Sequence, residues 1–160
     1  MSITIRGLQL PALLTELIEK GIWIDEKFLP EQPLKAMLAK AGLEQPLISI
    51  HGLETMKKEN LNYIYEDVKV FDNEFLTELE KVYAVRSSKY HNHPIIDSKL
   101  LDVDKAILIA SNGHGEDMLH LDYRSNLSEP RVMALIGEVS EWIVIAPNFT
   151  TFVTDLKLVH

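Results

Sequence analysis

The chain has 160 residues, of which 46% are hydrophobic, and its 24 acidic and 16 basic residues give a formal net charge of −8. This length and composition are typical of one globular domain and exclude a disordered tail, a collagen-like rod and a coiled coil. The absence of cysteine excludes disulfides, cysteine-ligated zinc and thiol catalysis. The negative charge disfavours nucleic-acid binding and favours a basic protein partner.

The first residues have apolar character, but Arg6, Gly7, Pro11 and Glu16 interrupt it before a signal-peptide core could form. No window reaches the roughly 18 uninterrupted apolar residues of a transmembrane helix. We therefore expect a cytoplasmic protein with no part in a membrane.

Apolar residues at helical spacing predict a helix over residues 11–20, with Pro11 in its first turn, and a second over residues 33–41, beginning at Pro33. A short strand is expected at residues 47–50. Residues 52–62 favour neither helix nor strand. The alternating aromatic and β-branched residues 63–71 indicate a strand or an extended edge.

Asp72 resembles the N-cap of a short helix carrying Phe75, Leu76, Leu79 and Tyr83, and the polar residues 87–99 indicate a loop. Short strands are then expected at residues 106–110, 118–123, 131–136 and 142–146. Close spacing predicts that they form an antiparallel meander. Asn148 should cap a final helix whose apolar stripe is Phe149, Phe152, Val153 and Leu156.

This order of elements predicts an α+β fold. We expect a single domain over residues 1–160, with an antiparallel or mixed sheet flanked by helices and the C-terminal helix packed on the sheet. The sequence offers no repeat, low-complexity tract or linker that would divide it.

An ordered set of motifs runs through residues 107–156. A hydrophobic strand precedes a glycine-rich turn with an acid, and further strands and a helix follow. The motif positions are Gly113, Asp117, Leu121, Asp122, Pro130, Val132, Trp142 and Phe149. Their order resembles the SUKH superfamily, whose members are related to the yeast Smi/Knr cell-wall synthesis regulator. A Leu-rich helix ending at Gly-x-Trp, from Leu13 to Trp23, resembles one bacterial branch of it.

The resemblance implies an α+β domain with a mixed sheet backed by helices, and a function in bacteria. Many members resemble immunity proteins, which bind and neutralise polymorphic toxins used against neighbouring cells. Many of those toxins are nucleases. The motif positions themselves are expected to be structural.

Two carboxylates near each other, Asp117 and Asp122, could bind a metal or share a proton. The structural alternative is favoured: an acid in a glycine turn accepts backbone N–H bonds, and Asp122 pairs with Arg124 or Arg131 across the strands. Trp142 is expected on a sheet face, packed on the last helix.

Four residues could form a metal site: His91, His93, His114 and Asp117. The first two histidines fall in a predicted loop and a third ligand is not specified, so a solvated loop is favoured and neither a metal nor a cofactor is expected. The run from Ser111 to Gly115 precedes a strand rather than a helix, which favours a tight hairpin over a phosphate-binding loop.

Six acidic residues and four aromatic residues lie between Tyr63 and Glu80. One interpretation is a solvated acidic face over aromatic core residues. The other is a surface that binds a basic partner, because aromatics anchor interfaces and acids speed the encounter. The candidate partner-binding residues are Tyr63, Tyr65, Glu66, Asp67, Asp72 and Glu74.

The resemblance implies, and the negative charge and the lack of a convincing catalytic constellation favour, a non-enzymatic immunity protein that neutralises a cognate toxin by stoichiometric binding, with no nucleic-acid partner. Two alternatives stay open. One is a regulatory protein-interaction module with a housekeeping partner. The other is a metal-dependent enzyme built on His91, His93, His114 and Asp117.

Overall fold

The computed structural model describes residues 2–43, 47–60, 84–85, 101–112, 117–136 and 142–159. In this part of the chain a five-stranded antiparallel sheet has the order β3-β6-β7-β8-β9. The strands are β3 (Ser49–Ile50), β6 (Ala106–Ser111), β7 (Met118–Asp122), β8 (Arg131–Leu135) and β9 (Ile143–Ala146). The predicted meander is therefore confirmed for β6 to β9, and the fold is α+β.

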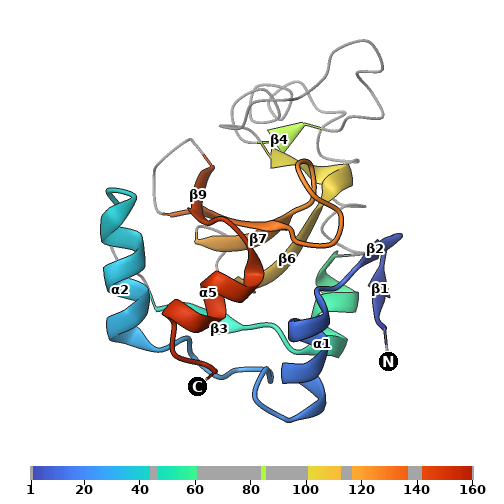
Figure 1. Cartoon of the computed structure of the whole chain (residues 1–160), viewed down its shortest axis with the longest axis horizontal. Helices are drawn as coiled ribbons and strands as arrows, with labels where there is room; N and C mark the ends of the chain where they lie inside the picture. The colour runs from blue at the N-terminus through green and yellow to red at the C-terminus, as the bar shows by residue number, and fades with distance from the viewer. Residues whose placement is uncertain are drawn as a thin grey trace.

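Three helices lie on one side of this sheet, with α5 between α1 and α2 (Figure 1). Their bounds are α1 (Ala12–Glu19), α2 (Glu31–Lys40) and α5 (Phe149–Asp155). The Asn148 side chain accepts a hydrogen bond of 2.8 Å from the backbone N–H of Thr151, so the predicted cap of α5 is confirmed. The predicted packing of this C-terminal helix on the sheet is also confirmed, by its contacts with β8 and β9.

The main core fills the space between these helices and the sheet. Its largest members are Trp23, Tyr123, Phe149 and Phe152, all at most 1% exposed. The rings of Trp23 and Phe149 meet edge to face, with centroids 5.8 Å apart. The indole N–H of Trp23 donates to the carbonyl of His51, which holds the chain after α1 against the chain after β3.

A second, smaller core lies on the other face of the sheet. It contains Leu101, Ala106, Met133, Leu135 and Trp142. The expectation that Trp142 packs on the last helix is therefore wrong. Successive side chains of a strand point to opposite faces, so Ile143 and Ile145 join the helix-side core while Trp142 and Val144 face away from it.

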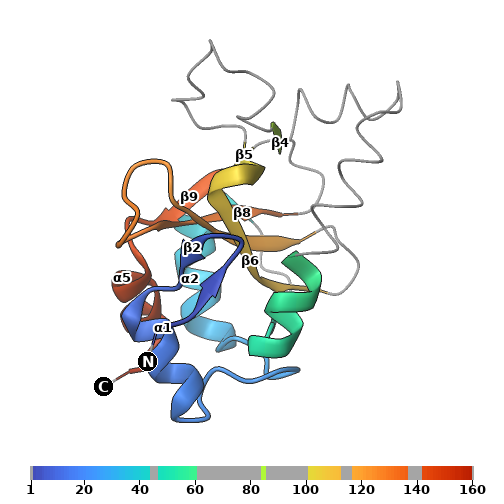
Figure 2. The same ribbon diagram turned by 90° about the vertical axis from the view of Figure 1, so that its right-hand side faces the viewer.

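An N-terminal hairpin was not predicted. Its strands β1 (Thr4–Ile5) and β2 (Leu8–Gln9) are joined by Arg6 and Gly7, with φ values of 52° and 79°. Two successive positive φ values are the signature of the tight type I′ hairpin turn. The Arg6 side chain donates to the carbonyl of Ala106, which places the hairpin beside β6 (Figure 2).

Helix α2 begins at Glu31, two residues before the predicted start. Pro33 lies in its first turn, where backbone N–H groups have no acceptor within the helix, so the ring is tolerated there. Residues 53–60, whose pattern was ambiguous, are helical.

The remaining described elements are β4 (Ala84–Val85), parallel to β5 (Leu101–Asp102), and the 3₁₀ turn η2 (Val103–Lys105). The expected strand over residues 63–71, the helix after Asp72 and the loop over residues 87–99 lie outside the described residues. None of the helices in the described ranges is long and apolar enough to cross a membrane.

Helical residues 53–60 protect the side of β6 that β3 leaves uncovered. The Asn60 carboxamide oxygen accepts from the N–H of Leu108 at 2.7 Å, and its amide nitrogen donates to the carbonyl of Leu108 at 2.9 Å. One buried side chain thus occupies the place of a partner strand.

Candidate interaction surface

Asp122, one of the motif acids, lies fully buried at the end of β7 and pairs with two arginines. Its Oδ1 accepts from Arg124 Nε at 2.8 Å, and its Oδ2 accepts from the guanidinium of Arg131 on β8. The sequence predicted either of these pairs, and both form. The Arg131 pair follows from the register, which sets the two residues opposite each other.

Burial alone would raise the pKa of Asp122. The hydrogen bonds and charge of Arg124, together with the hydrogen bond from Arg131, outweigh burial and hold this pKa below its ordinary value. A carboxylate that is charged and enclosed by two guanidinium groups is a poor general acid. Its geometry joins β7 to β8 and to the turn that follows β7.

Asp117 is buried immediately before β7. Its Oδ2 accepts from the side-chain amide of Asn112 at 2.6 Å, and its backbone carbonyl accepts from the Asn112 N–H at 3.2 Å. A side-chain amide therefore donates to this carboxylate, and the expected bonds from backbone N–H groups to it stay a prediction. The bonds join the two ends of the turn between β6 and β7.

Trp142 contacts His120 across the second core, edge to face, with ring centroids 4.7 Å apart. His120 is 1% exposed. Burial lowers its pKa to about 3, with the charges of Arg6 and His51 acting in the same direction. His120 is therefore neutral at physiological pH and packs against Trp142 in the second core.

The other described positions of the motif also lie in the packed fold. Leu121 and Val132 are opposite each other on β7 and β8 and fully buried, Pro130 is buried just before β8, and Phe149 begins α5. Gly113 lies outside the described residues.

A histidine and a serine that were not singled out as a pair meet where β3 joins β6. His51 Nε2 lies 2.9 Å from Ser111 Oγ, and both residues are buried. Burial lowers the pKa of His51, while Glu59 and Asp25 act against it. The Asp25 carboxylate accepts a hydrogen bond of 2.6 Å from the backbone N–H of Gly52, so it holds the chain beside His51.

The six predicted partner-binding residues all lie outside the described residues: Tyr63, Tyr65, Glu66, Asp67, Asp72 and Glu74. His91, His93 and His114 lie outside them as well. Asp117 is the one member of the predicted metal set that the structure places. Within the described ranges, no three histidine or acidic side chains converge as a metal site would require.

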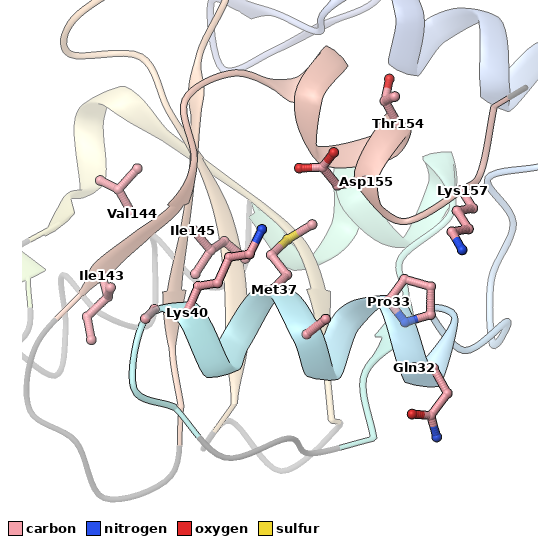
Figure 3. Close-up of a pocket in the computed structure, with 12 residues that line it drawn as sticks. Gln32, Pro33, Met37, Lys40, Ile143, Val144, Ile145, Thr154, Asp155 and Lys157 are labelled. Carbon is pink, nitrogen blue, oxygen red and sulfur yellow. The ribbon is translucent and has the colours of Figure 1, made fainter.

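A groove of about 680 Å³ lies between α2, β9 and the end of α5. Figure 3 shows Met37 and Lys40 of α2 facing Ile145 of β9 across it, with Asp155 and Lys157 at the α5 side. The sequence predicted each of these elements. It gave no signal that α2 would lie beside β9, because this contact joins segments that are distant in the sequence.

The chain matches no protein-family model, no curated protein and no solved structure.

Proposed function

We propose that the protein acts by binding another protein in one-to-one stoichiometry, without turnover, as an immunity protein of the SUKH type in the bacterial cytoplasm. The observation that carries the proposal is the use of the motif acids. Asp122 is enclosed by two arginines and Asp117 is bonded to Asn112, so both motif acids stabilise the sheet and its turns. This supports a binding role over the metal-enzyme alternative, which needs Asp117 as a ligand.

The distribution of charge supports a basic partner. The described residues contain 13 acidic and 11 basic side chains, a net charge of −2 out of the total of −8. The greater part of the negative charge therefore belongs to the remaining segments, and Glu66, Asp67, Asp72 and Glu74 are among them. A toxin that binds nucleic acid needs a basic groove for phosphates, and an acidic surface complements such a groove.

The proposal is tested by co-expression with the toxin-like domain encoded beside the gene, following bacterial growth and direct binding at two salt concentrations. The test variant reverses four acids to lysine: Glu66, Asp67, Asp72 and Glu74. The matched control reverses four exposed acids elsewhere, with the same change in net charge: Glu19, Glu31, Glu54 and Glu129.

We expect the natural chain and the control to rescue growth, and the test variant to lose rescue and bind more weakly. Added salt should weaken the binding of the natural chain, since exposed charges are screened. Equal rescue by both variants would contradict the acidic binding surface. Absence of rescue by the natural chain would contradict the immunity role itself, and a housekeeping partner recovered from lysate would then favour the regulatory alternative.

A further inference from the structure

The groove beside β9 has the geometry of a site for an extended peptide. One wall is β9, the last strand of the described sheet, and the other is α2, which contacts it. The described residues supply no partner strand for the outer edge of β9. Backbone N–H and C=O groups at such an edge can pair with an added strand.

Apolar side chains line the middle of the groove. Met37, Ala36 and Ala41 come from α2, and Ile143 and Ile145 from β9. Val144, on the same strand, is 38% exposed. This is the arrangement in which a strand gains affinity through its backbone and selectivity through alternate side chains that enter the groove.

The charges of the groove differ in sign from those of the chain. Lys40 at the end of α2 and Lys157 after α5 line it together with one acid, Asp155. Among the described residues, none of these three takes part in an ion pair. A net positive groove in a chain of charge −8 favours a ligand with carboxylates over a basic ligand.

We propose that this groove binds an extended, acidic peptide segment of a partner protein. The peptide backbone adds to β9, an apolar side chain contacts Met37, and a carboxylate is held by Lys40 or Lys157. The site is separate from the acidic residues of the proposed immunity function and has the opposite preference for charge. It therefore does not depend on that function.

The test selects random decapeptides, displayed on phage, against the full-length protein. Selected peptides are then synthesised, and their affinities are measured by fluorescence anisotropy for the natural chain and for the double variant K40E/K157E. The matched control is Lys35→Glu, an exposed lysine on the same helix that does not line the groove. Backbone NMR of the natural chain follows the amides of β9 on titration.

We expect peptides rich in Glu or Asp and in β-branched residues. Their affinity should fall about tenfold in the double variant and stay within about twofold in the control, since a charge-assisted hydrogen bond is lost only in the former. The amides of Ile143 to Ala146 should shift. Failure to select acidic peptides, or equal affinities in all three proteins, would overturn the proposal, and so would a stable dimer that K40E/K157E converts to monomers. That last result would identify a second copy as the occupant.

Discussion

Replacing Asp122 by asparagine tests the central structural assignment, because the two shapes are nearly the same and only the charge and two acceptor sites change. Asp122 is fully buried, and the side chain of Arg124 is 8% exposed. Without the carboxylate, the Arg124 guanidinium stays buried with no compensating charge. In D122N, the NH2 group of the asparagine would also face the guanidinium, and both groups are hydrogen-bond donors.

Breaking a buried pair on one side costs about 3–5 kcal/mol in the free energy of unfolding. Arg131 is 26% exposed and can turn partly to solvent, so most of this loss comes from Arg124. We therefore expect D122N to lose about 3–5 kcal/mol, and Arg131→Gln to lose clearly less than Arg124→Gln.

Urea unfolding followed by tryptophan fluorescence measures these differences, because Trp23 and Trp142 are both buried. The control is Glu16→Gln, which breaks an ion pair of 2.6 Å with Lys20 in which both side chains are more than half exposed. It should cost less than about 1 kcal/mol. If D122N were as stable as this control, Asp122 would be free for chemistry and the structural assignment would be wrong.

Three further substitutions test the cores and the sheet. Trp142→Ala should cost about 3–5 kcal/mol in urea unfolding followed through Trp23, and a loss below about 1 kcal/mol would mean that the second core is not packed around it. Because the pKa of buried His120 is about 3, mainly the unfolded chain takes up its proton as the pH falls below 6.5. The free energy of unfolding should therefore fall by about 2 kcal/mol between neutral pH and pH 5, and His120→Gln should remove this part of the pH dependence. Asn60→Ala should cost about 2 kcal/mol and speed hydrogen exchange at the Leu108 amide, whereas unchanged exchange would show that Asn60 does not protect β6.

Local patterns predicted the elements whose signals are contained in a few neighbouring residues. The cap at Asn148, the apolar stripe of α5 and the buried run of β6 are of this kind. The two pairs of Asp122 were also predicted, because Arg124 is two residues away and Arg131 lies on the next predicted strand, whereas the register that sets Arg131 opposite Asp122 comes from the structure. The N-terminal hairpin, which was not predicted, also has a local signal, a glycine between alternating apolar residues.

Features that depend on distant segments were not predictable. The face on which Trp142 lies is set by the register of β9 on β8, and this register shifts at a bulge between Val132 and Met133. The meeting of His51 with Ser111 joins residues 60 positions apart. The groove also needs α2 and β9, more than 100 positions apart in the sequence, and no local pattern shows that they lie together.

The two edges of the described sheet, at β3 and at β9, are covered differently, and this difference bears on function. Beyond β3, the Asn60 side chain pairs with Leu108, and the segment around Phe28 forms a bridge to Ser49 and bonds to Ile48 and Ile50. That side is closed by side-chain and backbone bonds. At β9 the described chain places two lysines and an open groove instead. Lysine at a sheet edge discourages nonspecific pairing, yet it leaves the edge accessible to a strand that brings carboxylates. The contrast between the covered β3 side and the groove beside β9, within the described residues, supports the proposed peptide-binding surface.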